Sequence, residues 1–562
     1  MKNSENIIRE LLALRGIRSE GEIHEYLTAK PKKTYDPFLM LGMREAVDTI
    51  CQCIENGDKI CVYGDYDCDG VTSVCLLTSV LEEVMPKEDV SYYIPSRFTE
   101  GYGLNKGAVK KIKNSGTSLI ITVDCGSVSY EEVEYAKNIG LKVIVTDHHN
   151  VNDKKADCIL LNPKQEECKY PFDGLCGCGV AYKLAQGLQR RLGFDRGIII
   201  RLLDLVGIAT IGDIVPLVDE NRTITKYGLN EIRQGRRQSL RILEEEISLH
   251  HEKVSSSNIA FGIVPNINAC GRMKDAGIAV SMIKGSDDSD LRAKVQDVVY
   301  LNRLRKNMQE EAFEKCLEIL DGEPKADFTV VKADVHEGIA GIVAGKLKDK
   351  LNRPCVLLTE SDGKLKGTGR SISGVNIYEL IKKQEDFLLR FGGHKGACGF
   401  LMEKENFQEF KEALQKDAYG LRIENQGIFE KEVSYDMELK LSDVSLDLAD
   451  SIAEMEPFGE GNPEPSFLFR DVYIYPNMRM GREKQHIKFI ASKDGKYVDC
   501  INFGDGAIIW ERFFNQSSMN YDENYMKVDL VGPLVINQFN GNRSAQIVIN
   551  DIDAIIDKKR NS

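Results

Sequence analysis

The sequence predicts a multidomain α/β protein with four parts: a doubly wound parallel sheet, a helical connector, a second and smaller α/β unit, and a C-terminal β-barrel. Between Lys59 and about Arg222, short β-branched runs alternate with helical stretches, which is the pattern of a parallel sheet with helices on both faces. A shorter α/β pattern begins at Asp327. From about Val433, short strands alternate with turn signals, which is typical of a small barrel.

The first half of the chain is expected to contain three parts in sequence. Residues 1–50 are expected to form short helices that lead into the first strand, and residues 51–225 the parallel-sheet domain. Residues 226–325 are expected to form the helical connector. It ends in a charged stretch from Ser289 to Leu320, which lacks Gly and Pro and has apolar residues at helical spacing, long enough to separate two domains as a stiff strut.

The second half contains the smaller α/β unit, at residues 326–426, and the barrel, at residues 430–562. The unit is expected to begin with the strand FTVVKA, the helix from Ile339 to Lys350 and the strand PCVLLTE, followed by two Gly-rich turns, GTGRSISG and FGGHKGACG. Five short strands are expected in the barrel: FLFRDVYIYP, HIKFIAS, YVDCINF, MKVDLVGPLVIN and SAQIVIND. Among such barrels the OB-fold is common in single-strand nucleic-acid binding.

Composition narrows the class of protein. A chain of 562 residues divides into three or four domains at roughly 150 residues each. The net charge of −13 argues against a protein that coats nucleic acid through bulk positive charge. The 15 cysteines include no C-x-x-C pair, which argues against a zinc ribbon. No apolar run approaches the ~20 residues of a membrane span, and the start lacks a signal peptide's apolar region, so a cytoplasmic protein without membrane contact is expected.

Three hydrophobic runs in the first third each end in an acidic or acid-imidazole cluster: KICVYGDYDCDG, SLIITVDCG and LKVIVTDHH. In an open α/β sheet, ligands sit beyond the carboxyl ends of the strands, so five Asp and two His are expected to converge on one crevice. Two cations that share carboxylates are the simplest way to keep this charge together, because packed ionised Asp side chains repel each other and otherwise take up protons. The sequence therefore predicts a two-metal phosphoesterase.

Each of these residues also has a plainer interpretation. An Asp triplet is most often a surface turn, an isolated Asp124 at a strand end is often a helix cap, and adjacent histidines are frequently exposed. Asp213, in the apolar stretch IATIGDIVPL, fits a buried capping group as well as a ligand. The apolar strand directly before Asp65 and the strand VIVTD before His148 favour the functional interpretation of those two clusters.

An ordered set of motifs carries a resemblance to a known family. GDYDCDGVTS, EGYGL, TVDCG, DHH at 147–149, GDIVPL–DENR, INACGRM, GRS at 369–371 and GGHKGACG occur in the order found in the RecJ exonucleases of the DHH phosphoesterase superfamily. The resemblance spans almost the whole chain. It implies a DHH phosphoesterase domain at 51–225, a DHH-associated substrate-binding domain at 326–426 and an OB-fold nucleic-acid-binding domain at 430–562.

The resemblance also implies roles for the clustered side chains. Asp67 and Asp69 each bind a different metal, Asp124 bridges the two, and the second metal also has His148 and Asp213 as ligands. Asp65, as a ligand or an outer group, and His149, near the phosphate, are expected to act in catalysis. A shell of carboxylates with one imidazole favours two divalent cations, Mn²⁺ first and Mg²⁺ second, over a tetrahedral zinc site.

Substrate contacts are expected from basic residues in the later motifs. Guanidinium forks match phosphate oxygens, and Gly-rich turns expose backbone N–H donors. Taken separately, each Arg is more often a surface ion-pair residue, but their places in the family's motifs favour phosphate binding. The candidate phosphate ligands are Arg97, Arg272, Arg370, Ser371 and His394.

The leading hypothesis is a metal-dependent 5′→3′ exonuclease that hydrolyses single-stranded DNA to mononucleotides in DNA repair and recombination. Polarity and the preference for DNA are implied by the resemblance alone, as are helicases or single-strand-binding proteins as partners. One alternative is a DHH phosphodiesterase acting on short RNA or cyclic dinucleotides. Another is an inactive DHH-type DNA-binding replication factor, which the filled ligand positions argue against.

The barrel is expected to extend the grip on DNA without taking part in the chemistry. From Lys431 to Ser562 there are 15 Lys and Arg against 22 Asp and Glu, which is too acidic for binding by overall charge. Exposed aromatic side chains that stack on bases, with a few cations along the backbone, are the expected alternative, although half of the aromatics or more are expected in the core. The candidates are Tyr473, Tyr475, Phe489 and Phe539, with Arg479, Arg482 and Lys488.

Overall fold

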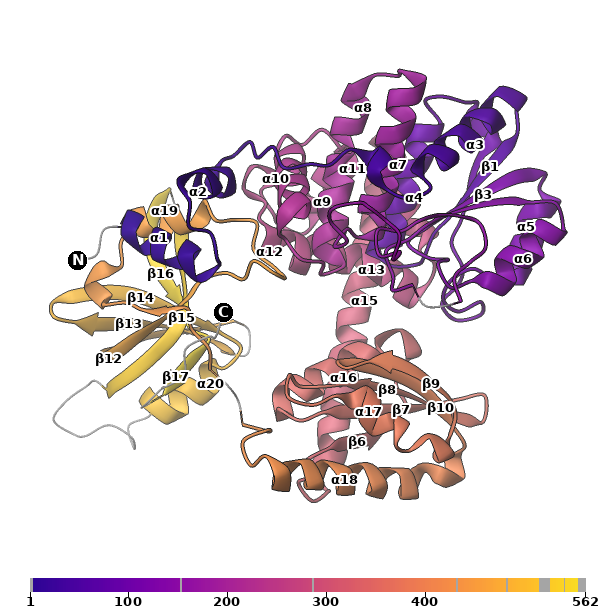
Figure 1. Ribbon diagram of the computed structural model, residues 1–562. Helices are drawn as coiled ribbons and strands as arrows, with labels where there is room; N and C mark the ends of the chain where they lie inside the picture. Colours follow the sequence, from indigo (N-terminus) through magenta and orange to yellow (C-terminus); the bar gives the residue numbers. More distant parts are fainter. Residues whose placement is uncertain are drawn as a thin grey trace.

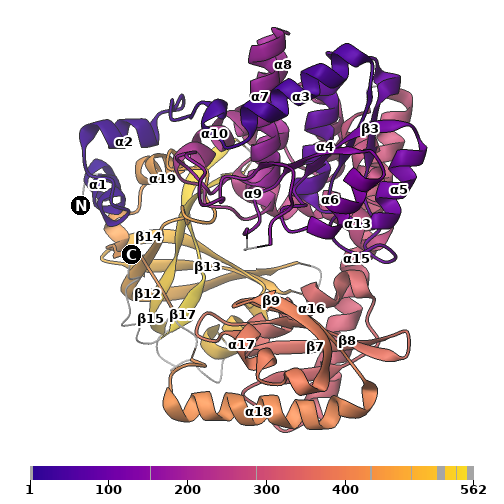
Figure 2. The ribbon, with the colours of Figure 1, turned by 45° about the vertical axis from the view of Figure 1, so that its right-hand side comes forward.

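The computed structural model describes residues 4–151, 154–285, 288–430, 433–481, 484–514, 526–539 and 541–553. Figure 1 shows the parallel-sheet domain with its helical connector, the second α/β unit beneath it and the barrel at the side. The long helix α15 runs from the first of these parts into the second, as Figure 2 shows from another direction. No helix in the described ranges is long and apolar enough to cross a membrane.

The first sheet is parallel throughout, with the strand order β2-β1-β3-β4-β5. Ile60 and Val62 of β1 belong to the core beneath α4 and α7, whereas Cys61 and Tyr63 belong to the core beneath α5 and α6. Both faces are therefore buried, which confirms the predicted doubly wound sheet. The strands are β1 Lys59–Tyr63, β2 Val90–Tyr93, β3 Thr117–Val123, β4 Lys142–Thr146 and β5 Ile159–Leu161; the helices are α3 Met43–Asn56, α4 Cys68–Leu81, α5 Lys106–Asn114, α6 Tyr130–Asn138 and α7 Gly177–Leu192, with short 3-10 turns at Pro37–Leu39 and Lys87–Asp89.

The helical connector packs into the same core as the inner face of the first sheet. Ile208 of α9, Ile267 of α13 and Leu291 of α15 are fully buried there with Val74 of α4. The charged stretch predicted as one stiff helix is α15, Asp288–Asp321. The other helical elements between α7 and α15 are α8 Arg196–Arg201, α9 Leu203–Gly212, α10 Asp219–Arg233, α11 Gln238–Glu246, a 3-10 turn at His251–Lys253, α12 Ser256–Asn258, a π-helical turn η4 Ile259–Ile263, α13 Val264–Met273 and α14 Gly277–Ile283.

The second sheet is mixed, in the order β6-β7-β8-β10-β9, with β6 and β7 parallel and the remaining pairs antiparallel. It comprises β6 Thr329–Lys332, β7 Cys355–Ser361, β8 Lys364–Arg370, β9 Leu388–His394 and β10 Ala397–Met402. Its helices are α16 Glu337–Leu351, α17 Ile377–Lys382 and α18 Phe407–Glu424, with 3-10 turns at Glu385–Phe387 and Lys404–Asn406.

The two Gly-rich segments, predicted as turns, are turns only at Ser373–Gly374 and Lys395–Gly396; for most of their other residues the prediction was wrong. GTGR ends strand β8, FGGH ends β9, and ACGF begins β10. The glycines serve cross-strand packing: a Cβ on Gly369 would come 2.5 Å from the Sγ atom of Cys398, and the ring of Phe400 occupies the space that a Cβ on Gly367 would need. Glycine content alone does not distinguish such strands from loops.

The barrel closes through β12-β13-β14-β16-β15, with β15 returning to β12 and β14 parallel to β16. This confirms the predicted OB-like barrel. Its elements are β11 Met437–Glu438, a 3-10 turn at Leu441–Asp443, α19 Leu446–Ala453, β12 Ser466–Met480, β13 His486–Lys493, β14 Lys496–Phe503, α20 Gly506–Ile509, a π-turn at Trp510–Phe514, β15 Met526–Phe539, β16 Asn542–Val548 and β17 Asp551–Asp553.

The N-terminal helices pack on the barrel, although the barrel comes much later in the sequence. Ile7, Leu11 and Leu12 are buried in the core that holds Phe467 and Phe489 of the barrel. Figure 1 shows both helices beside the barrel and away from the first sheet. Sequence patterns predict such helices but not their place, because the apolar stripe has no local partner. The two helices are α1 Ser4–Leu14 and α2 Glu20–Leu27.

Candidate metal centre

The Asp triplet lies in the turn between β1 and α4. Asp67 is the N-cap of α4, and its Oδ1 atom accepts hydrogen bonds from the backbone N–H groups of Asp69 at 3.0 Å and Gly70 at 3.2 Å. A Cβ on Gly70 would lie 2.7 Å from the backbone nitrogen of Asp65, so the turn requires glycine at this position. The capping geometry orders the triplet and leaves the carboxylates on one side of the turn.

Asp69 is held by the N-terminus of α7. Its carboxylate accepts hydrogen bonds from the backbone N–H groups of Gly177 at 2.6 Å and Cys178 at 2.7 Å. The partial positive charge of a helix N-terminus stabilises an ionised carboxylate. Gly177 also lets α7 approach the next ligand, since a Cβ there would lie 2.5 Å from the Cβ atom of Asp124. The motif GCGV, which sequence reasoning did not include, is therefore part of the centre.

The imidazole of His148 lies among three carboxylates that come from different parts of the chain. Its Nε2 atom is 3.1 Å from Oδ1 of Asp124, 3.5 Å from Oδ2 of Asp213 and 3.8 Å from Oδ2 of Asp69. Asp124 directly follows β3 and has a left-handed backbone, at a φ of 60°, and Asp213 is the C-cap of α9. The structure thus brings together the ligands expected from the strand ends with the one expected from the later helical motif.

Three overlapping groups of ligand atoms can each hold a cation. They are Asp65 with Asp67 and Asp124; Asp69 with His148 and Asp213; and Asp124 with His148 and His149, with all ligand atoms of a group within 4.8 Å of one another. Asp124 belongs to two groups. Among the residues that the structure describes, no hydrogen-bond partner is found for the buried atoms Asp65 Oδ1, Asp124 Oδ1, His148 Nε2 and Asp213 Oδ2. Buried polar atoms are rarely left unpartnered, so this donor set fits a pair of divalent cations.

The pKa values of the clustered side chains also favour bound divalent cations. Burial, followed by repulsion from Asp67, raises the pKa of Asp65 to about 8 and that of Asp69 to about 6. Burial and the neighbouring Asp69 raise the pKa of Asp213 to about 8, and the same causes raise the pKa of Asp124 well above its usual range. Burial lowers the pKa of His148 to about 3, which keeps the imidazole neutral and able to bind a metal. Bound cations would stabilise the ionised carboxylates and so lower these raised pKa values.

Asp147 is not a member of the three ligand groups and instead contacts both histidines. Its carboxylate accepts from the backbone N–H groups of Ser127 at 2.8 Å and His148 at 2.7 Å, and lies 2.8 Å from Nδ1 of His149. Burial raises the pKa of Asp147, but the bond with His149 and the backbone donors outweigh burial and hold this pKa well below its usual range. The same bond raises the pKa of His149 against the effect of burial.

Tyr102 is a second residue that sequence reasoning missed. Its hydroxyl lies 3.2 Å from Nε2 of His149, and it donates to the backbone carbonyl of Asp124 at 3.4 Å. The signal was present, because Tyr102 is the aromatic residue of the EGYGL motif. His149 is thus held between Asp147 and Tyr102, with its ring oriented next to the candidate metal ligands.

Three predicted arginines gather beside the acidic turn, together with an unpredicted fourth. The guanidinium of Arg97 stacks over the ring of Tyr66 at 4.0 Å, and Nη1 of Arg272 donates to the carbonyl of Gly338 at 3.3 Å. Burial and, after it, the charges of Arg97, Arg305 and Arg370 together lower the pKa of Arg272 to about 10, against the opposing effect of Asp67. Arg305 is 8% exposed on α15, where nothing in its local pattern marks it. Such a concentration of guanidinium groups suits a phosphodiester backbone.

The remaining predicted contacts lie at one end of the second sheet. Ala397 of β10 pairs with Arg370 of β8 on one side and with His394 of β9 on the other. Nδ1 of His394 accepts from the backbone N–H of Gly396 at 3.3 Å, and the imidazole is exposed. Ser371 donates its hydroxyl hydrogen to the carbonyl of Val375 at 2.7 Å. Arg370 and His394 therefore flank one strand end, whereas the Ser371 hydroxyl is engaged locally.

Of the barrel candidates, Phe489 was assigned wrongly to the binding face. It is fully buried in the barrel core, with its ring 5.8 Å from that of Phe514, because its register in β13 places it one residue away from the outward positions Lys488 and Ile490. Tyr473 and Tyr475 are half-buried, as is Lys488, which pairs with Asp499 at 2.9 Å. Arg479 lies 5.9 Å from the ring of Trp510. Arg482 and the side chain of Phe539 lie outside the described residues.

Comparison with known families divides the chain in the same way as the fold. Residues 59–210 match the DHH family, N-terminal domain; residues 325–419 match the DHHA1 domain; and residues 435–551 match the RecJ OB domain. The three matches fall on the first sheet, the second sheet and the barrel respectively. The site residues lie in the first two regions and in the connector between them.

Whole-chain relatives share this arrangement. The chain is 35% identical over 556 residues to the single-stranded-DNA-specific exonuclease RecJ of Bacillus subtilis, covering 97% of this chain and 67% of that protein. It is 32% identical to the exonuclease of the same name from Salmonella typhimurium, covering 97% and 95%. Crystal structures of RecJ from Thermus thermophilus with Mn²⁺ and with Mg²⁺ superpose with TM-scores of 0.79 and 0.73, at 28% and 27% identity, and each covers 98% of this chain and 76% or 74% of that protein.

Proposed function

The chain belongs to the RecJ family of single-stranded-DNA-specific exonucleases, and from this premise we propose how its residues perform the hydrolysis. The match extends through the barrel, which favours a polymeric substrate over short RNA or cyclic dinucleotides. It also favours an enzyme over an inactive DNA-binding factor. We further propose a cytoplasmic role in DNA repair and recombination, with helicases or single-strand-binding proteins as partners, on the strength of the family alone.

Two divalent cations are proposed to occupy the ligand groups, with Mn²⁺ preferred and Mg²⁺ an alternative. The observation that carries this proposal is the position of Asp124, which belongs to two of the groups and has a buried, unpartnered Oδ1 atom. When bound, such a pair supplies Lewis-acid chemistry by withdrawing charge from the phosphoryl group and lowering the pKa of water. The proposed ligands are Asp67, Asp69, Asp124, His148 and Asp213, with Asp65 as a ligand or an outer group.

The other side chains are proposed to bind and orient the phosphodiester. Arg97, Arg272 and Arg370 offer guanidinium donors beside the acidic turn and neutralise the approaching backbone. His149, whose protonated form is favoured by Asp147, is proposed to donate a hydrogen bond to the phosphoryl group. Because the imidazole is fixed on both sides, this donor is oriented before the substrate arrives.

Polarity is proposed to be 5′→3′, with release of mononucleotides. Arg370 and His394 lie on either side of Ala397 at one end of the second sheet, where a terminal 5′-phosphate would meet two cationic donors. Strand entry from the 5′ end would then place the first phosphodiester between this end of the sheet and the metal centre. Ser371 directly follows Arg370, but its hydroxyl donates to the carbonyl of Val375 and its backbone N–H to the carbonyl of Gly396.

One assay tests the proposal. Single-stranded DNA, the matching duplex and short RNA, each labelled at one end, are incubated with Mn²⁺, Mg²⁺ or EDTA, and the products are resolved by length. Phosphorothioate linkages at either the 5′ or the 3′ end test polarity. We expect mononucleotides from single-stranded DNA with Mn²⁺, and protection only by 5′ modification. Activity in EDTA would contradict the metal assignment, and protection by 3′ modification would contradict the polarity.

A further inference from the structure

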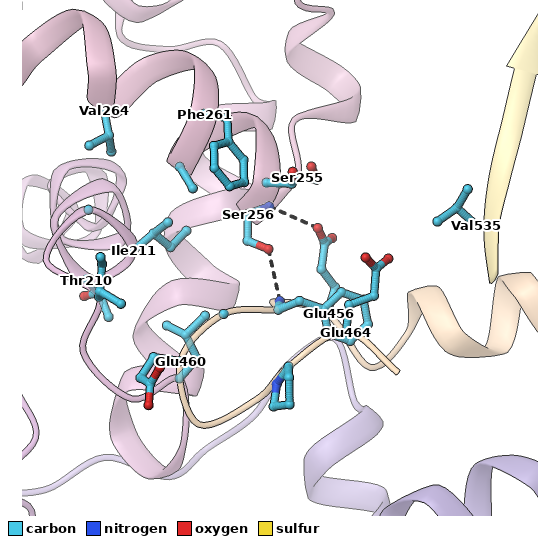
Figure 3. A pocket seen from close by; sticks show the side chains of 18 of the residues that line it. Thr210, Ile211, Ser255, Ser256, Phe261, Val264, Glu456, Glu460, Glu464 and Val535 are labelled. Atoms are coloured by element: carbon cyan, nitrogen blue, oxygen red, sulfur yellow. Dashed lines mark hydrogen bonds between the residues drawn. The ribbon is translucent and has the colours of Figure 1, made fainter. Parts of the chain in front are cut away.

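A groove with a volume of about 1550 Å³ runs from the neighbours of Asp213 to the barrel. Near the centre it is lined by Gly212 and Ile214, which flank Asp213, and by Arg272 and Arg305. At its other end it reaches β15 and β16 of the barrel. Figure 3 shows part of this groove, with Phe261 and Val264 on one wall, Glu456 and Glu464 on the segment opposite and Val535 of the barrel at the side. The groove is therefore continuous with the proposed phosphate-binding residues.

Two large apolar side chains are exposed in this groove, and both stand on irregular backbone. Phe261 is 79% exposed and lies in the π-helical turn Ile259–Ile263. Ile214 is 70% exposed and has a φ of 58°, which is a strained conformation for a β-branched residue. Isolated exposed apolar residues are ordinary on protein surfaces. Here, however, the two side chains lie in one groove. One stands on a π-helical turn and the other has a strained backbone, and both features concentrate at functional sites.

We propose that Phe261 and Ile214 contact the unpaired bases of the DNA strand next to the metal centre, and that this contact contributes to selectivity for single strands. The proposal rests on the exonuclease function given above. A base in single-stranded DNA can offer its face to an aromatic ring, whereas a base in a duplex is already stacked on both faces and paired at its edge. Contact with the apolar wall therefore stabilises a bound single strand but not a bound duplex.

The charges along the groove fix the side on which the sugar-phosphate backbone runs. Arg272 and Arg305 line the inner end, and Lys253 and Arg543 line the end near the barrel. On the opposite segment, Glu456 is paired with Arg233 at 3.0 Å and accepts from the backbone N–H of Ser256 at 3.0 Å. Glu460 and Glu464 of the same segment repel phosphates. The backbone is thus expected to follow the arginines, with the bases turned toward the apolar wall.

The test measures the coupling between the Phe261 ring and a single base. Oligodeoxynucleotides that carry one abasic site at successive positions from the 5′ end are titrated into the full-length wild type and into Phe261→Ala, in EDTA, and the Kd is read by fluorescence anisotropy. We expect Phe261→Ala to raise the Kd for the intact strand roughly five- to a hundredfold, as for a lost base–aromatic stack. One abasic position should weaken binding to the wild type and cause no further loss in the variant.

Three further variants complete the test. Phe261→Trp should restore binding, because an indole also stacks on bases. Tyr419→Ala removes an aromatic ring that is 51% exposed on α18, a helix on the far side of the second sheet in Figures 1 and 2, and should leave binding unchanged. Ile214→Ala should weaken binding in EDTA, where its proximity to the metal ligand Asp213 has no influence on the readout.

Two outcomes would overturn the inference. The first is an unchanged Kd for Phe261→Ala, which would mean that the groove receives something other than the DNA strand, such as a peptide segment of a partner. The second is an abasic-site profile that is the same in the wild type and the variant. Failure of the exonuclease proposal is separate, since it would appear as absent hydrolysis by the wild type, whatever the Phe261 variants bind.

Discussion

Gly271 of α13 lies directly against the backbone carbonyl of Tyr66, so that a Cβ at residue 271 would come within less than 3.0 Å of that oxygen. Tyr66 stands between Asp65 and Asp67, and the next residue on α13 is Arg272. This contact therefore sets the distance between the turn proposed to bind metal and an arginine proposed to bind phosphate. Gly338 of α16 makes a similar approach to the carbonyl of Arg272, which joins the second sheet to the same point.

Gly271→Ala is expected to reduce turnover at least tenfold and to destabilise the fold by about 1–3 kcal/mol, because the neighbour is backbone and cannot move aside. Turnover on single-stranded DNA and the urea midpoint are the measurements. Gly345→Ala on α16 is the matched control, since a Cβ there has no neighbour within 4 Å. Wild-type turnover by Gly271→Ala would show that the spacing is not critical.

Asp124→Ala is expected to abolish hydrolysis without unfolding the protein. The variant loses the carboxylate shared by two ligand groups, and it also loses a buried carboxyl group whose ionisation is disfavoured by burial and by Asp69 in the metal-free protein. Turnover, Mn²⁺ binding by calorimetry and thermal melting in EDTA should be measured in the same buffer. Near-normal turnover would contradict the bridging role.

The metal-free protein is expected to lose stability as the pH rises. Asp65 and Asp213 have folded-state pKa values of about 8, above their ordinary value, so between about pH 4 and pH 8 the folded state binds more protons than the unfolded state. Stability contributed by the protonated forms is thus present at low pH and is lost through this window. Melting temperatures in EDTA should fall from pH 5 to pH 8, and saturating Mn²⁺ should remove most of this slope; a rise in EDTA would refute the assignment.

Arg370→Ala is expected to weaken binding of strands that end in a 5′-phosphate more than strands that end in a 5′-hydroxyl. A charge-assisted contact to phosphate is worth roughly 1.5–3 kcal/mol, which corresponds to about a ten- to a hundredfold loss of affinity. Competition binding with the two kinds of end gives the ratio directly. Arg353→Ala, at a guanidinium that contacts the carbonyl of Phe429 instead, serves as the control. Equal losses on both ends would show that Arg370 does not read the terminal phosphate.

Removal of the barrel is expected to preserve the chemistry but to weaken binding of long strands. The N-terminal helices must be removed with it, because Ile7 and Leu11 would otherwise lose the barrel core that buries them. A protein comprising residues 31–426 should cut oligonucleotides of a few bases and lose affinity for strands of about twenty or more. Retained affinity for long strands would assign the barrel another role.

The sequence alone predicted the candidate ligands that lie at strand ends. Asp124 directly follows β3, and Asp65, Asp67, Asp69 and His148 lie a few residues beyond β1 or β4, where the carboxyl ends of parallel strands meet at one edge of a sheet. The order of the domains and the long helix α15 could also be predicted from local sequence, since they follow from periodicity and composition.

Tertiary structure decided the rest, because these features depend on contacts between residues far apart in sequence. The place of Asp213 beside His148, the burial of Arg305 among the other arginines, and the packing of Leu11 against the barrel each require a partner that local patterns do not specify. The Gly-rich segments became strands because Cys398 and Phe400 fill the space across from their glycines, and Phe261 stands exposed because the groove around it is built from several separate segments.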